Sequence, residues 1–149
     1  MVTDVNPAGT VPFIVVDGKM MNESAAVMKY LCMRFGAQMP NVDALYPSGD
    51  LEKRYQIDRA LDFNGSEFRP AFMGNIFLKF GSRGRDFNEF EQTRWDMGVE
   101  KCNQKLKLLD DMLAESTGVF LVGDSLTIAD LAIYCEYRDV DYLGIFDVS

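Results

Sequence analysis

The sequence predicts an α+β protein in which a short β-hairpin and one helix come before an all-helical region. Two observations support this fold class. Two apolar runs flank an Asp-Gly dipeptide near the N-terminus, and the regular patterns after residue 50 have the spacing of amphipathic helices. The composition is that of an ordinary globular protein, with 149 residues of which 48% are hydrophobic and 26% charged.

The N-terminal element is the segment VPFIVVDGKMM, which predicts two strands around a tight turn. Asp17 and Gly18 accept the positive φ angles that such a turn requires. The next segment, NESAAVMKYLCMRFG, predicts a helix that is capped by Ser24 and followed by Gly36. Residues 37–49 contain two prolines and no apolar period. We therefore expect domains at residues 1–37 and 50–149, joined by a linker at residues 38–49.

The region after residue 50 predicts helices that pack into one core. Residues 50 to about 80 form one long amphipathic stretch, which we expect to bend near Pro70 because proline removes a backbone donor. A GSRGRD loop follows. The next apolar stripe has helical spacing and is expected to face the core; it consists of Trp95, Val99, Cys102, Leu106, Leu109 and Leu113.

A local signal marks the start of the last helix. Thr127 and Asp130 have the spacing of a capping box, with an acid in place of the usual Glu or Gln, and Leu126 and Leu131 stand at the positions of a hydrophobic staple. We interpret Thr127 and Asp130 as a structural device that starts a buried helix.

Charge and residue types exclude several functions. The net charge of −8 repels phosphate backbones and anionic lipid, so nucleic acid is not an expected partner. The sequence has no histidine, which removes Ser-His-Asp triads and His-ligated metal sites, and no metal is expected.

The cysteines predict reduced thiols used as small core residues, because no CxxC motif is formed by Cys32, Cys102 and Cys135. No apolar run reaches the roughly 18 residues of a membrane span. The N-terminal segment MVTDVNPAG has no targeting pattern, so a cytoplasmic location is expected. The alternative is an organelle, if a targeting segment precedes these residues.

Three short blocks of the sequence form motifs at residues 6–12 (NPAGTVP), 22–31 (NESAAVMKYL) and 123–130 (GDSLTIAD). Together these blocks resemble the cytosolic glutathione transferases, above all the theta type. The blocks are similar to that family's N-P-x-G-x-V-P loop, its E-S-x-A-I-x-x-Y-L helix start and its G-x-x-x-T-x-A-D helix start. The resemblance implies that residues 1–37 form part of a thioredoxin-like, glutathione-binding lobe. Residues 50–149 would then form most of the family's all-helical C-terminal domain.

The resemblance implies a glutathione site at Val11, Pro12, Glu23 and Ser24. In the family, a cis proline presents the backbone of the preceding residue to the cysteinyl part of glutathione, a role that falls to Val11 and Pro12. The hydroxyl of Ser24 and the amides of a helix N-terminus suit the γ-glutamyl carboxylate, and Glu23 suits the ammonium. The alternative is that Glu23 and Ser24 merely cap the helix and that Pro12 is an edge-strand proline. Glutathione is a co-substrate here, and no cofactor is implied.

The resemblance also implies a pocket for a hydrophobic electrophile, bordered by the segment LDFNGSEFRPAF. Phe63, Glu67 and Arg69 are the candidate residues, with Ser66 beside them. The alternative is that these side chains lie on an ordinary solvated helix surface.

The family's catalytic Tyr, Ser or Cys belongs to a strand-helix-strand unit that precedes the first block, and further helices follow the last one. We therefore expect no catalytic residue in these 149 residues. Two hypotheses stay open. The chain is part of a glutathione transferase truncated at both ends, or it is a non-catalytic, glutathione-transferase-like subunit of a larger complex. In either case a homodimer mate or another subunit is the expected partner, because a two-stranded half-sheet leaves an open edge.

Overall fold

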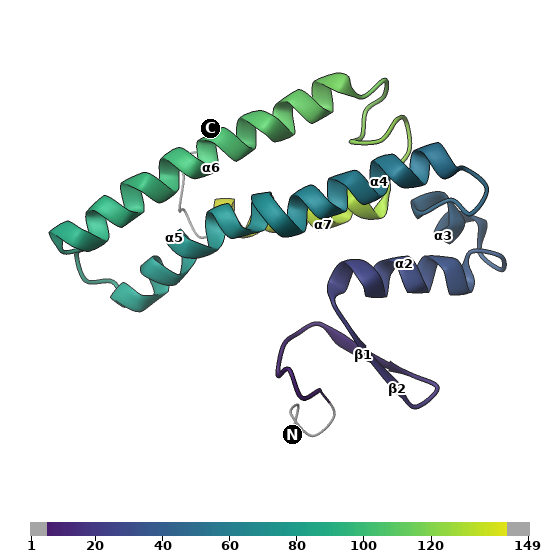
Figure 1. Cartoon of the computed structure of the whole chain (residues 1–149), viewed down its shortest axis with the longest axis horizontal. Coiled ribbons are helices and arrows are strands. Elements are labelled where there is room, and N and C mark those ends of the chain that lie inside the picture. The colour runs from purple at the N-terminus through teal and green to yellow at the C-terminus, as the bar shows by residue number, and fades with distance from the viewer. Residues whose placement is uncertain (1–5, 143–149) are drawn as a thin grey trace.

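The computed structural model describes residues 6–142 and confirms the predicted α+β class (Figure 1). The expectations drawn from the first five residues and from the last seven lie outside the described part. In chain order the elements are β1 (Phe13–Val16), β2 (Lys19–Asn22), α2 (Ser24–Phe35), α3 (Pro40–Leu45), α4 (Leu51–Phe63), the π-helix η1 (Asn64–Phe68), α5 (Arg69–Ser82), α6 (Glu89–Glu115) and α7 (Ile128–Tyr142).

The predicted hairpin is present. β1 and β2 pair antiparallel, with Phe13 opposite Asn22 and Val16 opposite Lys19. Asp17 and Gly18 connect them with φ angles of 51° and 74°, as a two-residue turn that matches the strand twist requires. Arg34 of α2 forms an ion pair with Asp17 over 2.8 Å, so the helix and the turn are also joined by their side chains.

The start of α2 differs from the prediction. Ser24 is the first helical residue, and the preceding position belongs to Glu23, whose side chain makes no capping hydrogen bond. The backbone carbonyl of Glu23 accepts the first helical bond, from the Val27 N–H over 2.9 Å. Neither predicted cap therefore acts through its side chain. Gly36 follows the helix as expected, but it keeps right-handed helical angles.

The segment that joins the two predicted domains is partly helical. α3 lies within it, and its Val42 and Leu45 pack against the core although the sequence shows no apolar period there. Tyr46, which follows α3, is buried, and its hydroxyl donates to Asp58 of α4. Asp58 also forms an ion pair with Lys29 of α2 over 2.7 Å, so it links α2 to the helical region.

The long stretch from residue 51 to residue 82 is interrupted just before Pro70. The last α-helical residue of α4 is Phe63, and a π-helical turn fills the gap before α5 starts at Arg69. Proline in a helix has no N–H and its ring collides with the carbonyl four residues earlier, here that of Ser66. In a π-helical turn the carbonyl of Ser66 does not need a hydrogen bond from residue 70, the bond that Pro70 cannot donate.

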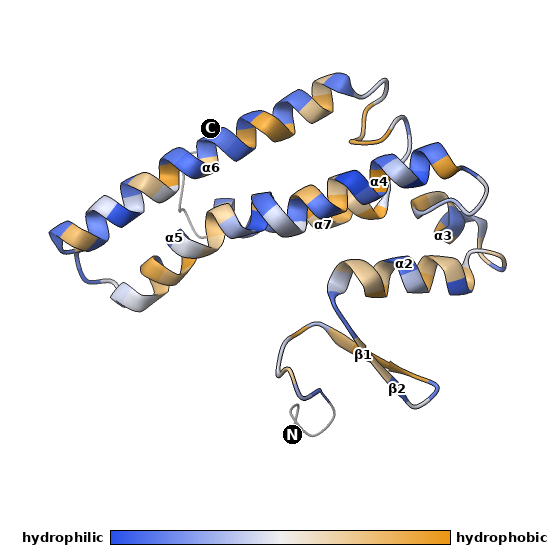
Figure 2. Cartoon of the chain, viewed as in Figure 1, coloured by the Kyte–Doolittle hydropathy of each residue, from blue (hydrophilic) through white to orange (hydrophobic). Residues whose placement is uncertain are grey.

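The core lies where α4, α5, α6 and α7 meet, and α2 adds Cys32 to it. Its fully buried side chains include Phe68, Phe72, Ile57 and Ile128. Polar and apolar residues are interspersed along the whole of α6, as an amphipathic helix requires (Figure 2). Most of that stripe is buried or packed against the core, but Leu113 is 42% exposed, which corrects the expectation that the whole stripe is covered.

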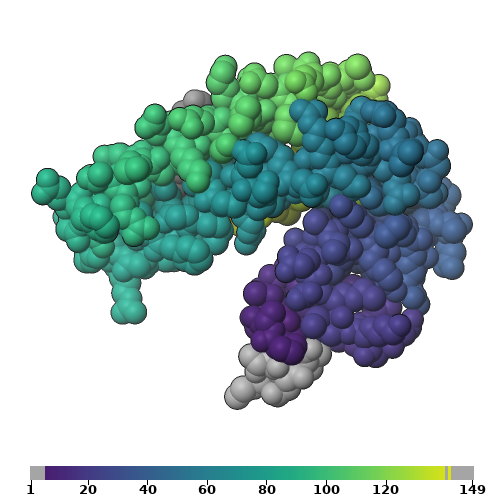
Figure 3. All heavy atoms as spheres, in the orientation of Figure 1, coloured from purple at the N-terminus to yellow at the C-terminus, as the bar shows by residue number. Residues whose placement is uncertain are grey.

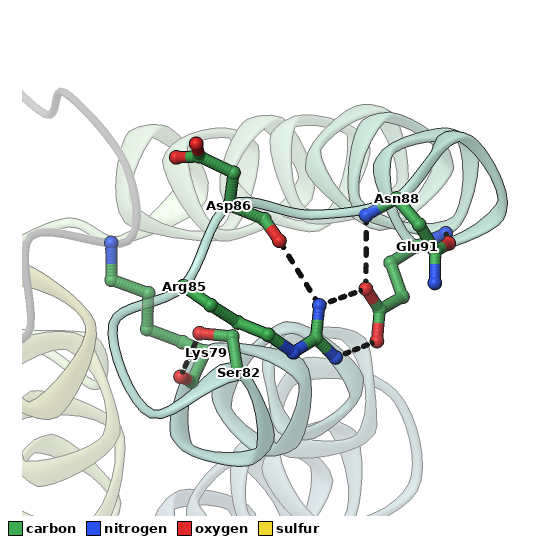
Figure 4. Close-up of polar contacts among 6 residues, drawn as sticks. All are labelled: Lys79, Ser82, Arg85, Asp86, Asn88 and Glu91. Carbon is green, nitrogen blue, oxygen red and sulfur yellow. Dashed lines mark hydrogen bonds and ion pairs between the residues drawn. The ribbon is translucent and has the colours of Figure 1, made fainter.

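The loop between α5 and α6 is held by polar side chains (Figure 4). Asn88 and Glu91 form a full capping box at the start of α6, each side chain accepting a backbone N–H of the other residue. Arg85 donates to Glu91 Oε2 over 2.7 Å and to the Asp86 carbonyl over 3.0 Å. The predicted GSRGRD loop is therefore a defined turn, but it begins at Arg83, because Gly81 and Ser82 still belong to α5.

The start of α7 is fixed by one carboxylate. Asp130 Oδ2 accepts the backbone N–H of Thr127 over 2.8 Å and its hydroxyl over 2.7 Å. Asp130 Oδ1 accepts the N–H of Leu121 over 2.8 Å, so the same side chain also holds the preceding loop.

Candidate functional site

One pocket of about 370 Å³ lies between the N-terminal unit and the helices. Its lining comes from three parts of the chain that are far apart in sequence: the loop before β1, the start of α2, and a wall formed by α4, η1, α5 and α7. These parts face each other across the concave side of the molecule, between the purple N-terminal residues and the teal helices (Figure 3). The lining residues are Thr10, Val11, Pro12, Glu23, Ser24, Ala25, Met28, Leu61, Asn64, Gly65, Arg69, Ala132 and Glu136.

The loop before β1 is held by Asn6, a residue that sequence reasoning did not single out. Asn6 is completely buried. Its side-chain amide donates to the Thr10 carbonyl over 2.6 Å, and its side-chain oxygen accepts the Ala8 N–H over 3.2 Å. Asn6 therefore fixes the loop that carries Thr10 and Val11 to the pocket. The motif that contains Asn6 was recognised from sequence, but its burial depends on the folded loop.

Val11 and Pro12 form one rim of the pocket. The Val11–Pro12 peptide bond is cis, as the resemblance implied. Val11 is 78% exposed, and its backbone N–H and carbonyl have no hydrogen-bond partner within residues 6–142. Both groups can therefore pair with an extended peptide-like ligand, as the free edge of a strand does.

Glu23 and Ser24 form another part of the rim of the same pocket. Glu23 has φ 65°, in the left-handed region that costs a residue with a side chain about 1 kcal/mol or more. Both side chains are exposed to solvent and both line the pocket. The first amides of α2 have no acceptor within their own helix, which favours an anionic group at this end. A carboxylate, a hydroxyl and free amides thus stand side by side at one end of the pocket.

The helical wall carries an ion pair between Arg69 of α5 and Glu136 of α7. The Glu136 side chain is 13% exposed and that of Arg69 is 51% exposed, so the carboxylate is the more deeply set partner. Sequence reasoning named Arg69 but missed Glu136 and Asn64. Ala132 and Glu136 share a helix face by their spacing, yet only the packing of α7 shows that this face meets the pocket.

Phe63 and Glu67 do not join Arg69 at this pocket, which corrects the expected grouping. They line a different hollow, between α4, η1 and α6, together with Ser66. The ring of Phe63 packs on Phe68, with centroids 5.8 Å apart, and Glu67 forms an ion pair with Lys105 of α6. The physical reason is the π-helical turn, which places successive side chains at angles that the ordinary helical period does not predict.

Other chemistry is sparse in the described part. Cys32 and Cys102 are buried, as expected for core residues, but Cys135 is exposed and is not a core residue. Residues 6–142 hold no cluster of three or more acidic or cysteine side chains arranged to bind a metal ion. None of their helices is long and apolar enough to cross a membrane.

Two family models match the chain. A glutathione S-transferase N-terminal domain matches residues 2–39, and a glutathione S-transferase C-terminal domain matches residues 86–147. The chain belongs to the glutathione S-transferase family. The family inferred from three short blocks is thereby confirmed, and so is the combination of a thioredoxin-like N-terminal part with a helical C-terminal domain.

Individual glutathione transferases resemble the chain over nearly its whole length. The probable glutathione S-transferase 9 of Caenorhabditis elegans is 31% identical over 93% of this chain and 61% of its own. A delta-class enzyme of Nilaparvata lugens is 29% identical, with a TM-score of 0.75 over 98% of this chain and 61% of that one. Human glutathione transferase theta-2 is 26% identical, with a TM-score of 0.77 over 95% of this chain and 56% of that one. The chain thus spans at most 61% of the length of these relatives.

Proposed function

We propose that this chain supplies the glutathione-binding residues, and part of the second-substrate pocket, of a glutathione transferase that attaches the glutathione sulfur to a hydrophobic electrophile. The observation that carries the proposal is the meeting of Val11 and Pro12 with Glu23 and Ser24 around one pocket. The reading of Glu23 as a mere helix cap is disfavoured, because its side chain makes no capping bond.

The pocket suits glutathione group by group. The free backbone N–H and carbonyl of Val11 can pair with the cysteinyl residue, as an added strand would. Ser24 and the first amides of α2 offer donors to the γ-glutamyl carboxylate. The Glu23 carboxylate stands next to them and suits the ammonium of the same γ-glutamyl group. Human glutathione transferase theta-2 was solved in complex with glutathione, which supports the assignment of this ligand class.

The role of these residues is to bind and orient. They hold the peptide so that the thiol sulfur faces the helical wall, where an electrophile can stand. Glutathione loses its thiol proton to solvent, and the thiolate sulfur forms a carbon–sulfur bond to the electrophile. The electron pair of the bond broken at that carbon departs with a leaving group or shifts to a neighbouring atom, which is then protonated. No catalytic residue is assigned to this chain.

Titration calorimetry of the chain with reduced glutathione tests the proposal. We expect binding by the natural chain, and binding weakened about tenfold or more when Glu23→Ala and Ser24→Ala are combined, because two partners of charged groups are lost. The matched control combines Ser48→Ala with Glu52→Ala, which removes another exposed serine and glutamate outside the pocket and should leave the affinity unchanged.

Two results would contradict the proposal. Unchanged affinity in the Glu23→Ala, Ser24→Ala chain would place glutathione elsewhere. No binding at millimolar glutathione, together with co-purification in a large complex, would instead support a structural subunit of the glutathione-transferase type.

We further propose a cytoplasmic location and association with a second copy or another subunit. The two-stranded sheet, of order β1–β2 in the described part, supports association, because a sheet this small is marginal without further cover. Sedimentation of the natural chain at micromolar concentration would show a mass above 16.8 kDa if a second copy covers it.

A further inference from the structure

The two sides of the pocket belong to parts of the chain that meet through α2. The rim residues Val11, Glu23 and Ser24 lie on the loop before β1 and at the start of α2, and the rest of the lining belongs mainly to the helical wall. The hairpin packs on α2, and α2 packs on α3 and α7. α2 thus lies between the hairpin and the helical region (Figure 1). Its position therefore sets how far the rims stand from the helical wall.

An ion pair between α2 and α4 fixes that position close to the pocket. Nζ of Lys29 in α2 lies 2.7 Å from Oδ1 of Asp58 in α4. Lys29 follows Ser24 by five residues, which is about 7.5 Å along the helix axis. Asp58 precedes Leu61 of the helical wall by three residues, less than one turn. A shift at this contact is therefore passed to both sides of the pocket over short stretches of helix.

Asp58 is held in place from its own side of the contact. The hydroxyl of Tyr46 lies 3.1 Å from both Oδ1 and Oδ2 of Asp58 and donates to that carboxylate. Tyr46 is itself buried, and the guanidinium of Arg54 lies over its ring, 4.5 Å from the centroid. Arg54 also donates to Sδ of Met33 over 3.5 Å, a second polar contact between α4 and α2. The carboxylate therefore has a defined direction toward α2.

The apolar contacts of α2 with the core define its position less sharply. They come from Ala25, Met28 and Cys32, which are two small side chains and a flexible thioether. Such a surface can slide with little loss of contact, whereas a hydrogen-bonded ion pair has a fixed length and direction. The side chains of Lys29 and Asp58 are 26% and 38% exposed, so water screens their attraction only in part.

We propose that Asp58 is a positioning residue, which sets the separation between the glutathione rims and the helical wall through Lys29. This inference rests on the proposed function. A ligand held by the rims alone does not sense that separation, but a ligand that extends from the rims to the wall does. Sulfur and electrophile are in the second situation, and an error of about 1 Å in their placement costs about a hundredfold in rate. Asp58 does not line the pocket, so it acts on the ligand only through other residues.

Two ligands separate positioning from simple binding. Reduced glutathione contacts the rims, and S-hexylglutathione adds an alkyl chain that can reach Leu61 and Ala132 of the helical wall. We expect the natural chain to bind S-hexylglutathione about tenfold more tightly than glutathione, because burial of even two methylene groups contributes that much. Titration calorimetry measures both affinities and requires no turnover.

Variants of the ion pair should remove this preference selectively. Asp58→Asn should lower the affinity for S-hexylglutathione about tenfold and leave the affinity for glutathione within about twofold of the natural value. Lys29→Met should do the same, and the two changes combined should cost no more than either alone, because both remove one contact. Asp58→Glu keeps the charge and should restore part of the preference.

Two control variants should keep the preference for S-hexylglutathione. Arg34→Met removes an ion pair of the same helix, but with Asp17 in the hairpin turn and not with the helical region. Gly98→Ala places a β-carbon against Asn75, away from the pocket, and controls for a general loss of stability. Urea denaturation shows which variants are folded under the conditions of the titration. If Asp58→Asn does not fold, Lys29→Met decides.

The outcomes separate this inference from the proposed function. Loss of both affinities in equal proportion would show that the ion pair only supports the fold, and two unchanged affinities would show that apolar packing alone sets the separation. Either result would overturn this inference alone, and so would a natural chain that binds the two ligands equally. Failure of the natural chain to bind either ligand would overturn the proposed function as well.

Discussion

Asn75 of α5 fills the space that Gly98 of α6 leaves open. A β-carbon on Gly98 would lie 1.7 Å from Asn75 Oδ1, far inside van der Waals contact. The Asn75 side chain is almost completely buried and donates to the Trp95 carbonyl over 3.1 Å. The close approach of α5 and α6 therefore depends on the absence of a side chain at position 98.

Gly98→Ala should accordingly destabilise the fold. We expect the free energy of unfolding to fall by about 1–3 kcal/mol, the usual cost of overpacking, as measured by urea denaturation. Gly74→Ala is the control, because Gly74 is helical and nothing lies within 4 Å of its added β-carbon. That variant should be neutral or more stable by up to about 1 kcal/mol, since alanine favours helix. Equal effects of the two substitutions would contradict the packing interpretation.

Asp130→Asn should also destabilise the fold. The carboxylate accepts backbone N–H groups from Leu121 and Thr127, one on each oxygen, and an amide can accept only on one side. We expect a loss of about 1–3 kcal/mol in the free energy of unfolding, from one unpaired and partly buried N–H. Asp124→Asn, at an exposed aspartate nearby, should stay within about 0.5 kcal/mol of the natural chain. A small effect at Asp130 would show that water replaces the lost acceptor.

The same residue shows what the sequence can and cannot predict. Thr127 and Asp130 are only three positions apart, so the capping box that they form can be predicted from their spacing in the sequence. The bond from Leu121 crosses nine residues of loop and depends on the folded chain. The residues at the rims of the pocket could likewise be predicted from the sequence, because each rim lies within one contiguous motif.

The helical wall of the pocket could not be predicted in this way, because its residues come together only in the folded chain. Glu136 meets Arg69 only because α7 packs beside α5, and no spacing in the sequence relates two residues so far apart. Phe63 and Glu67 were misplaced for a local reason, since the π-helical turn between α4 and α5 shifts the helical period. Pro70 indicated that the helix is interrupted there, but it could not indicate the kind of turn.

Arg85 and Glu91 give the loop between α5 and α6 a pH dependence. The hydrogen bond from Arg85 and the backbone N–H of Asn88 lower the pKa of Glu91 from 4.5 to about 2. A depressed carboxyl pKa stabilises the folded state above the unfolded pKa, and this contribution is lost as the pH falls from 4.5 towards 2. A double-mutant cycle of Arg85→Gln and Glu91→Gln, followed by urea denaturation, should show favourable coupling at pH 7. The coupling should fade below pH 4.5 and weaken with salt. Coupling that is independent of pH would contradict an ionic origin.

The three cysteines should differ sharply in reactivity. Cys102 is fully buried and donates its thiol to the Ala71 carbonyl over 3.0 Å, and burial raises its pKa to about 12. Burial, and then the negative charge of Asp43, raise the pKa of Cys32 as well. Cys135 is exposed.

Because the thiolate is the reactive form, brief treatment of the folded chain with iodoacetamide at pH 8 should alkylate Cys135 alone. At that pH a thiol with a pKa of about 12 is ionised to only about one part in ten thousand. Peptide mass spectrometry measures the modified fraction at each site. Cys135→Ser should remove the fast modification, whereas unfolding in urea should expose the two buried thiols and let them react at similar rates. Alkylation of Cys102 in the folded chain as fast as that of Cys135 would show that α5 and α6 separate readily, against the tight packing at Gly98.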